Sequence, residues 1–370
     1  MPPVKTYQIM TNLDCNLRCR YCYEKQKAQG ANDLDSVCAF LDAAAEDMRR
    51  KAPDDVTHIE FIGGETFLHM ELLRPAVEHF IARCSVLCPD RPFILGFTTN
   101  GTLFARPEVR DFLRDFAPYL HVGFSIDGTR QVHDANRVDA SGNGTYDRAV
   151  EGYRICRAYL PDSRMYVKAT FNHATVGSWE ASVRHLMELG FRRICANVVF
   201  EETWTADDYP GLLDQMIAVA DHLVDHQLLD TVFVDQLNRD GLPLSFPVRA
   251  EVTGNYCGAC RYMRCLGFDG KVYGCQKFAS AQVLPVGQVD AQGLSITRQD
   301  VLDEVSRLFE HGKAACGDCG FRSACPVCLA EPYLRKEDPA AYFRRRTYCG
   351  FTCAMMMARL HIVERLEGAR

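Results

Sequence analysis

Three cysteines near the start of the chain stand on one short stretch with the spacing C-x3-C-x2-C: Cys15, Cys19 and Cys22. Three thiolates on one loop can surround a single metal cluster. Iron–sulfur clusters are normally held by four cysteine thiolates, so a cluster with only these three protein ligands keeps one iron open to another molecule. A structural zinc site is the alternative, but it needs four ligands, and no fourth cysteine or histidine lies near this stretch. The spacing therefore favours an iron–sulfur cluster with an open iron.

A second group of cysteines occupies the last third of the chain. Ten of the 18 cysteines belong to it, in the order Cys257, Cys260, Cys265, Cys275, Cys316, Cys319, Cys325, Cys328, Cys349 and Cys353. No secretory signal precedes them, so their clustering predicts metal clusters in a reducing compartment. A zinc ribbon is the alternative here, but its cysteine pairs typically stand about 15–20 residues apart. Only five residues separate Cys319 from Cys325, which favours iron–sulfur clusters.

Both groups of cysteines resemble those of the radical S-adenosylmethionine (radical SAM) superfamily. The front loop has the spacing of that family, with the aromatic Tyr21 just before the third cysteine. The order of the tail cysteines resembles the SPASM extension, which carries two auxiliary [4Fe-4S] clusters. The resemblance implies SAM and three [4Fe-4S] clusters as cofactors. It also implies that the open iron binds the amino and carboxylate groups of SAM, and that the cofactor generates a 5′-deoxyadenosyl radical while the protein binds and orients the reactants.

The resemblance further implies a ligand set for each auxiliary cluster. The first would use Cys257, Cys260, Cys275 and Cys328, and the second would use Cys316, Cys319, Cys325 and Cys349. Cys265 and Cys353 are then left over, and either could displace a neighbour. One spacing departs from the family, since Cys325 and Cys328 are separated by two residues where relatives more often have three.

Short apolar runs alternate with amphipathic ones from residue 5 to about 200, which predicts six strands and five helices. The predicted strands are Tyr7–Met10, His58–Ile62, Phe93–Thr98, His121–Ile126, Met165–Phe171 and Ile194–Phe200. The predicted helices are Asp35–Arg50, Met70–Arg83, Pro107–Asp115, Tyr146–Tyr159 and Ser178–Leu189. Such alternation predicts an α/β fold with a parallel sheet and right-handed crossovers, and six units fit the partial (β/α)6 barrel of the radical SAM family.

The predicted division of the chain follows from these patterns. Residues 1–200 form the radical SAM partial barrel, and residues 201–250 form a helical connector with one helix at Leu212–Leu229. Residues 251–370 form a small cysteine-rich SPASM domain that ends in a helix from Cys353 to about Leu366.

Candidate SAM-binding residues follow the second and third predicted strands, since chemistry in such barrels lies at the carboxyl ends of the strands. Gly63, Gly64, Glu65 and Thr66 are similar to the family's GGE motif, with Thr66 in place of the usual proline. Glycines let the backbone approach a ligand closely. Asn100 lies in a segment similar to the family's TNG segment, although Asn-Gly is also a common turn.

Further candidates follow the fourth and fifth predicted strands. Ser125 and Asp127 resemble the position at which relatives bind the ribose of SAM. Arg137 could bind the SAM carboxylate, since a guanidinium is its natural bidentate partner, or it could hold Asp134 or Asp127 in a structural ion pair. Asn172 lies just past the fifth strand and could face the same cavity.

Composition narrows the partners and the location. A net charge of −6 without a basic block argues against nucleic acid as a partner. The sequence has no N-terminal apolar segment and no long apolar run. We therefore predict that the protein has no signal peptide and no membrane span, and that it is cytoplasmic. Many peptide maturases begin with a leader-recognition domain, whereas the cysteine loop here starts by residue 15, so no such domain is expected.

The resemblance implies a maturase that crosslinks or cyclises a ribosomally made precursor peptide through a carbon–carbon or thioether bond. A low-potential donor such as flavodoxin or ferredoxin would supply the electrons. The alternative is an anaerobic sulfatase maturase that forms formylglycine, which shares His133-Asp134 and the run Gly142–Tyr146 with this chain. Ile62 and Thr66 stand where those enzymes usually carry glutamine and proline. A non-enzymatic electron carrier or zinc scaffold is a third hypothesis, but neither needs the SAM-binding motifs.

Overall fold

The computed structural model describes residues 4–25, 27, 30–238, 257–290, 293–314, 316–317, 319–321, 325, 327–338, 341–342 and 348–368. The second part of the predicted connector, from residue 239 to 250, lies outside the described residues.

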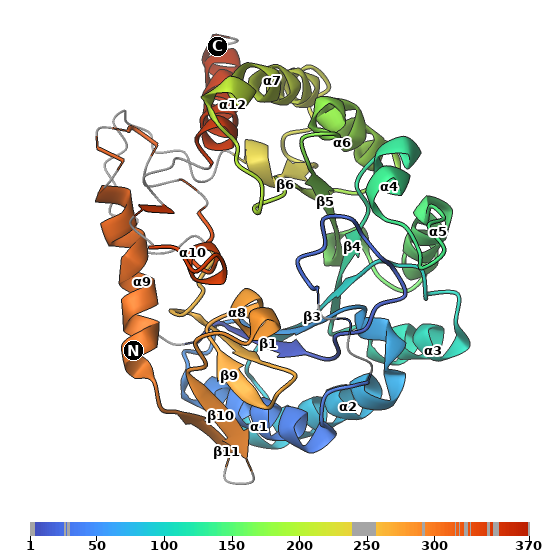
Figure 1. The fold of residues 1–370 in the computed structure, drawn as a ribbon. Helices are drawn as coiled ribbons and strands as arrows, with labels where there is room; N and C mark the ends of the chain where they lie inside the picture. The colour runs from blue at the N-terminus through green and yellow to red at the C-terminus, as the bar shows by residue number, and fades with distance from the viewer. Residues whose placement is uncertain are drawn as a thin grey trace.

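One curved sheet organises the chain, with the strand order β11-β10-β9-β8-β1-β2-β3-β4-β5-β6-β7 (Figure 1). Neighbouring strands from β1 to β7 run parallel, which confirms the predicted α/β barrel. These strands are β1 (Thr6–Met10), β2 (Thr57–Ile62), β3 (Phe93–Thr99), β4 (Leu120–Ser125), β5 (Met165–Phe171), β6 (Arg193–Val198) and β7 (Phe233–Val234). Because the strands are parallel, their carboxyl ends meet at one rim of the barrel.

Helices connect the strands and cover the outside of the curved sheet (Figure 1). They are α1 (Leu34–Arg50), α2 (Met70–Leu87), α3 (Pro107–Phe116), α4 (Arg130–Asn136), α5 (Tyr146–Cys156), α6 (Trp179–Glu188) and α7 (Tyr209–Asp225). Short 3-10 helices add single turns at Thr66–Leu68, Asp162–Arg164, Val176–Ser178, Ala206–Asp208 and Asp235–Leu237. The sequence did not predict α4, because seven residues are too few to show a helical period.

The core between sheet and helices anchors the segment that follows β2. Phe67, in the 3-10 turn directly after Glu65, is fully buried. Its ring meets Phe104 at a centroid distance of 5.0 Å and Phe97 at 5.6 Å. Burying one such side chain contributes about 1.5–3 kcal/mol, so the aromatic cluster fixes the end of β2 at the rim.

The cysteine-rich tail continues the barrel sheet. Strand β8 (Met263–Leu266) pairs parallel with β1, while β9 (Lys271–Tyr273), β10 (Gly287–Asp290) and β11 (Gly293–Ile296) follow as antiparallel neighbours. Strands β8 and β9 thus form a small antiparallel hairpin that turns at Asp269-Gly270. The tail helices are α8 (Gln276–Ala281), α9 (Gln299–Ala314), α10 (Glu331–Leu334) and α12 (Cys349–Gly368).

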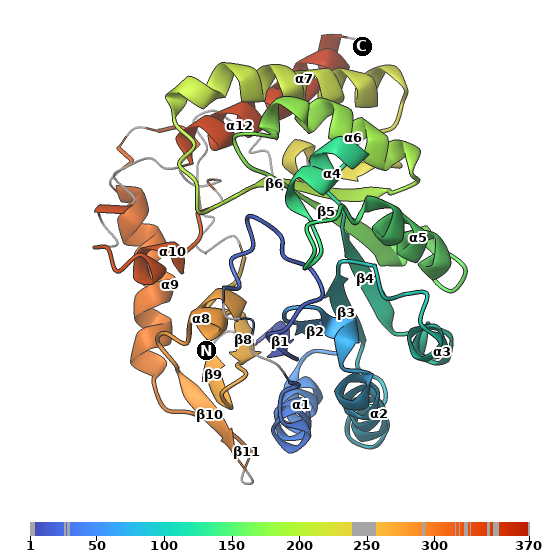
Figure 2. The ribbon, with the colours of Figure 1, turned by 45° about the vertical axis from the view of Figure 1, so that its right-hand side comes forward.

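The final helix lies at the other edge of the sheet. Helix α12 begins at Cys349, four residues earlier than the predicted Cys353, and lies along α7 (Figure 2). The tail therefore contacts the barrel at both ends of the strand order. Among the described residues, no helix combines the length and the apolar character that crossing a membrane requires.

Candidate functional site

A cavity of about 360 Å³ opens at the carboxyl ends of the barrel strands. The cavity is lined by the cysteine loop after β1, by residues of β2 to β6 and the loops that follow them, by Arg137 after α4, and by the first two residues of α8, Gln276 and Lys277. The volume lies within the range of small-molecule sites, about 300–1,000 Å³. The sequence-predicted residues that line this cavity are Cys15, Cys19, Tyr21, Cys22, Gly63, Gly64, Glu65, Asn100, Ser125 and Arg137.

The cysteine loop is held against the segment that follows α4. The amide of Arg18 donates to the carbonyl of Val138 at 2.7 Å, and the amide of Arg20 donates to the carbonyl of Asn136 at 2.9 Å. Leu17, directly before Arg18, is buried. The loop is therefore fixed by backbone hydrogen bonds on both sides of Cys19.

Each cysteine of the loop has a nitrogen donor beside its sulfur. The amide of Leu17 lies 3.3 Å from Cys15 Sγ, Arg137 Nη1 lies 3.9 Å from Cys19 Sγ, and Lys27 Nζ lies 3.4 Å from Cys22 Sγ. Hydrogen bonds to cluster sulfurs and positive charge stabilise thiolate ligands and tune the cluster. Three half-buried thiols that face one cavity fit a cluster with an open position.

Without a metal, the thiols of Cys15 and Cys19 are held protonated. Burial raises the pKa of Cys15 to about 12, and the carboxylate of Glu65 adds to the shift. Burial also raises the pKa of Cys19, although Arg137 lowers it. Metal ligation requires the thiolate, so cluster assembly at this loop must release protons.

The glycines after β2 allow two loops to pack closely. The amide of Gly64 donates to the carbonyl of Asn12, and the amide of Glu65 donates to the carbonyl of Asp14, both at 3.0 Å. A Cβ on Gly64 would lie 1.8 Å from the oxygen of Asp14, and one on Gly63 would lie 2.4 Å from the oxygen of Asn12. Besides lining the cavity, the two glycines therefore let the backbone of the β2 loop hydrogen-bond to the segment that leads into the cysteine loop.

Glu65 connects the β2 loop to the end of β3. Its buried carboxylate accepts hydrogen bonds from Thr99 Oγ1 at 2.6 Å, from the amide of Asn100 at 2.7 Å and from the amide of Phe67 at 3.3 Å. The Asn100 side chain in turn donates to Asn16 Oδ1 at 2.8 Å and lies 3.9 Å from Cys15 Sγ. Burial raises the pKa of Glu65, while these hydrogen bonds lower it. Glu65 therefore positions Asn100, which contacts the cysteine loop.

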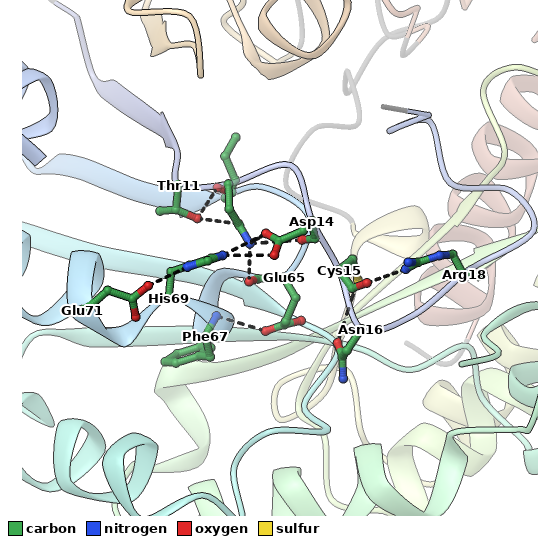
Figure 3. Close-up of polar contacts among 11 residues, drawn as sticks. Thr11, Asp14, Cys15, Asn16, Arg18, Glu65, Phe67, His69 and Glu71 are labelled. Atoms are coloured by element: carbon green, nitrogen blue, oxygen red, sulfur yellow. Dashed lines mark hydrogen bonds and ion pairs between the residues drawn. The ribbon is translucent and has the colours of Figure 1, made fainter. Parts of the chain in front are cut away.

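His69, which directly precedes α2, holds the start of the cysteine loop from a second point (Figure 3). His69 Nε2 lies 3.0 Å from Asp14 Oδ1, and His69 Nδ1 lies 2.7 Å from Glu71 Oε1. Burial alone would lower the pKa of His69, but its hydrogen bonds to the two carboxylates raise it above the ordinary value. The start of α2 is thus tied to the residue that precedes Cys15.

Arg137 and Asp127 form a buried ion pair. Asp127 Oδ1 accepts from Arg137 Nε and from the amide of Thr170, each at 3.0 Å, while Oδ2 accepts from the Tyr21 hydroxyl. The guanidinium also lies 5.3 Å from the centroid of the Tyr21 ring. Burial would lower the pKa of Arg137, but Asp127 raises it above the ordinary value. Of the two roles that the sequence left open for Arg137, the ion pair with Asp127 is present, and the guanidinium still faces the cavity.

Three predicted SAM-binding residues contact neighbouring protein groups and are not among the residues that line the cavity. Asp127 is fully buried in its ion pair. Thr66 is buried, and its hydroxyl donates to the carbonyl of Thr98 at 3.2 Å. Asn172 donates to Asn136 Oδ1 at 3.1 Å and accepts from Thr175 Oγ1 at 2.9 Å. Ser125 lies at the cavity, and its ribose contact stays a prediction.

The cysteines predicted to hold the first auxiliary cluster are neighbours in the structure. Burial raises the pKa of Cys275, and Cys328, Cys257 and Cys260 add to that shift through their proximity. The amide of Cys260 donates to the carbonyl of Gly274 at 3.0 Å, so its backbone lies beside the residue that precedes Cys275. Cys265 is fully buried in β8.

Three cysteines of the second predicted set, Cys319, Cys325 and Cys349, lie in or near α12. Cys349 is the first residue of that helix, and Cys325 Sγ lies 3.3 Å from Thr352 Oγ1. Burial raises the pKa of Cys353, and nearby Cys319 adds to the shift. Cys353 therefore stays a candidate ligand beside the predicted four. In the described part of the chain, no three Cys, His, Asp or Glu side chains converge closely enough to hold a single metal ion.

Sequence reasoning missed three lysines of the cavity, Lys27 beside Cys22, Lys168 and Lys277. Lys277 makes ion pairs with Glu201 at 2.7 Å and with Glu331 at 2.6 Å, which joins α8 both to the loop after β6 and to α10. Lys168 lies on β5, where the alternation of inward and outward residues could have placed it inside the barrel. The partners of Lys277 are distant in sequence and left no local signal.

Comparison with known proteins gives consistent relatives. Residues 11–180 match the family described as Radical SAM superfamily. The cysteine-type anaerobic sulfatase-maturating enzyme of Clostridium perfringens is 24% identical over 304 residues, which cover 74% of this chain and 75% of that enzyme. The serine-type anaerobic sulfatase-maturating enzyme of Klebsiella aerogenes is 29% identical over 161 residues, which cover 41% of this chain and 36% of that enzyme. The chain thus spans about a third to three-quarters of the length of these relatives.

Solved structures show the same fold. The structure described as native anSMEcpe with bound AdoMet has a TM-score of 0.71 at 15% identity, and the alignment covers 96% of this chain and 99% of that one. Streptococcus suis SuiB bound to precursor peptide SuiA has a TM-score of 0.55 at 14% identity, with coverage of 91% and 74%.

Proposed function

We propose that this chain, a radical SAM protein with a cysteine-rich tail of the SPASM type, oxidatively modifies a peptide substrate. One observation carries the proposal. The cysteine loop with Cys15, Cys19 and Cys22 and the segment directly after Cys275 line the same cavity. A substrate in that cavity would therefore lie next to both predicted cofactor sites.

The chain's own residues would prepare this site in three ways. When bound, SAM and its cluster would supply a 5′-deoxyadenosyl radical that removes a hydrogen atom from a substrate carbon. Asn100 and Arg137 place N–H groups beside two of the cluster ligands. Tyr21 and Asp127 hold the Arg137 guanidinium in place. The surrounding barrel encloses the reactants and limits their contact with water, which reduces side reactions of a radical.

The tail would complete the oxidation. Closing a crosslink removes two hydrogens from the peptide, one as a hydrogen atom and the other as a proton and an electron. The reaction therefore needs an electron acceptor within reach of the cavity, and Cys257, Cys260, Cys275 and Cys328 are the residues that would hold one. A low-potential donor such as flavodoxin or ferredoxin would supply the electron that starts each turnover.

Formylglycine formation on a sulfatase is the second candidate. The C. perfringens relative, a cysteine-type anaerobic sulfatase-maturating enzyme, aligns over 74% of this chain and over 75% of its own length. Ile62 and Thr66 still stand where sulfatase maturases usually carry glutamine and proline. Both candidates use the same cavity and differ in the peptide that enters it.

Mass spectrometry after anaerobic reaction separates the two candidates. The reconstituted full-length enzyme is given SAM, a reductant and either a small peptide encoded beside its gene or a sulfatase fragment with its target cysteine or serine. Loss of two hydrogens with fragmentation blocked across a few residues establishes a crosslinking maturase. A product on the sulfatase fragment that reacts with hydroxylamine establishes an aldehyde, and hence formylglycine. No change in either peptide, although SAM is cleaved, would contradict both.

A matched pair of variants shows whether the front cysteines are responsible. Replacing Cys15, Cys19 and Cys22 together by alanine should abolish SAM cleavage and remove about four iron atoms per chain, as expected for one [4Fe-4S] cluster. The half-buried Cys38 on α1 is the control, and Cys38→Ala should leave iron content and SAM cleavage unchanged.

A further inference from the structure

Lys168 lines the cavity, and its ammonium has no ion-pair partner among the described residues. Lys168 is the middle residue of β5, in register with Ser125 of β4 and Cys195 of β6. Its side chain is exposed to the cavity that the cysteine loop also lines. The ammonium lies 5.6 Å from the centroid of the Tyr166 ring. Within the described residues, no hydrogen bond or ion pair of this ammonium is found.

The other charged groups that line the cavity have partners. Arg137 pairs with Asp127, and Lys277 pairs with Glu201. Glu65 accepts its three hydrogen bonds, Glu24 accepts from Ser280 Oγ at 2.5 Å, and Lys27 lies beside Cys22 Sγ. Among the cationic side chains of the cavity, Lys168 is therefore the one whose head group has neither an ion pair nor a hydrogen-bonding partner within the described residues.

The groups around Lys168 keep it protonated without neutralising it. Tyr166 raises the pKa of Lys168 most, burial lowers it, and Glu60 raises it further. Glu60 itself accepts a hydrogen bond from Gln8 Nε2 at 2.9 Å. The Tyr166 ring packs against Gly123 on β4, and it can do so because Gly123 has no side chain: a Cβ there would lie 2.3 Å from the ring. An ammonium in such a site is a natural partner for a carboxylate.

We propose that Lys168 binds a carboxylate of the substrate, so that the peptide carries an acidic residue at or next to the residue that is modified. This inference rests on the proposed function and names its substrate class. The carboxylate of SAM is the other possible source. Arg137, with Nη1 3.9 Å from Cys19 Sγ, lies beside the cysteine loop where SAM is expected to bind. Lys168 lies on β5 and, within the described residues, makes no hydrogen bond or ion pair with that loop, whose nearest influence on it is the electrostatic one of Tyr23, the residue after Cys22. We therefore assign Lys168 to the peptide.

Peptide selection with reconstituted enzyme tests the proposal. Full-length holoenzyme with SAM is immobilised anaerobically and exposed to a library of short peptides randomised at every position. Wild-type enzyme should enrich Asp or Glu at one position. Lys168→Gln should lower the affinity for the enriched acidic peptides about tenfold or more, as expected when a hydrogen bond to a charged group is lost. Lys168→Arg should keep the preference, and Lys168→Glu should change it to Lys or Arg.

Two controls separate the explanations. Lys271→Gln removes an exposed lysine on β9 that pairs with Asp269 and should leave the selection unchanged. The affinity for SAM without peptide is measured in wild type and in Lys168→Gln at equal iron content, and equal affinities are expected if the bound carboxylate belongs to the peptide. If Lys168→Glu does not load iron, Lys168→Gln and Lys168→Met carry the test.

Each other outcome has a distinct meaning. Peptides retained without acidic preference, or with a preference that Lys168→Gln does not change, overturn the role of Lys168 and leave peptide modification standing. Weaker SAM binding in Lys168→Gln assigns the carboxylate to SAM and overturns the assignment to substrate. If wild-type holoenzyme retains no peptide at all, the proposed peptide function fails together with the inference.

Discussion

Replacing Asp127 by asparagine should destabilise the barrel and the cysteine loop together. The carboxylate is fully buried and accepts hydrogen bonds from Arg137, Tyr21 and the amide of Thr170. Asparagine keeps the size of the side chain but removes its charge, which leaves the Arg137 guanidinium buried without a counter-ion. Removing one partner of a buried ion pair costs about 3–5 kcal/mol. We expect a loss of that order in the free energy of unfolding.

The physical reason predicts how a second substitution behaves. In the double variant Asp127→Asn/Arg137→Met, no charge is left buried alone, so the loss should be smaller than the sum of the two single losses. Urea unfolding of the four proteins, followed by far-UV circular dichroism at one pH, measures these differences. Iron content reports the cysteine loop separately, because Arg137 also lies beside Cys19.

An exposed ion pair provides the matched control. Asp300 pairs with Arg298 on the surface at 2.7 Å, and exposed pairs contribute little to stability. Asp300→Asn should therefore leave the urea midpoint unchanged. A loss below about 1 kcal/mol in Asp127→Asn, or single losses that simply add in the double variant, would refute a structural ion pair.

Three further changes test how neighbouring segments support the two cysteine regions. Gly64→Ala should abolish iron loading of the front loop, because its Cβ would lie 1.8 Å from the oxygen of Asp14; Gly211→Ala in α7, where no atom lies within 4 Å of the new Cβ, should load normally. Wild type should have a higher free energy of unfolding than His69→Gln. This difference should be fully present below the ordinary histidine pKa of about 6.5 and should be lost as pH rises through the raised pKa of His69 in the folded protein. A difference in urea midpoint that does not depend on pH would contradict this. Gln8→Met should weaken the attachment of α8, because Gln8 Oε1 accepts from the first amide of that helix at 3.1 Å, at a cost of about 1–3 kcal/mol for an unpaired buried group. Electron paramagnetic resonance should then show an altered auxiliary cluster and an unchanged SAM cluster, and identical spectra would count against that attachment.

The barrel could be predicted from sequence because its signal is local. Each predicted strand from Tyr7–Met10 onward overlaps an observed strand within about two residues at either end, since period-two alternation is written in neighbouring residues. The cysteine spacing likewise placed three thiols on one loop. The parallel pairing of β8 with β1 could not be predicted, because it joins residues about 250 positions apart and long-range register leaves no mark in a short window.

Tertiary context also decided roles that the sequence left open. The sequence left three possible partners for the Arg137 guanidinium, namely the SAM carboxylate, Asp134 and Asp127, and only the fold could show that Asp127 lies at 3.0 Å. Thr66 departs from the family's usual proline. Its hydroxyl donates to the carbonyl of Thr98, which a proline cannot do, so the departure has a local structural use. The sequence suggested that Gly63 and Gly64 let the backbone approach a ligand. In the structure, a side chain at either position would collide with residues Asn12 to Asp14, which lead into the cysteine loop.

The extension of the sheet gives the two cysteine regions a common frame. The cysteine loop follows β1 directly, and Cys275 follows the β8–β9 hairpin, whose first strand is hydrogen-bonded to β1. Gln8 on β1 adds a buried link to α8, and Asn32 donates both to the carbonyl of Met10 and to that of Gly267. A sheet resists changes in strand spacing, because every shift breaks a row of backbone hydrogen bonds at once. The separation between the two predicted cluster sites is therefore set by strand pairing. A substrate in the shared cavity would meet both sites at a fixed distance without any movement of the tail.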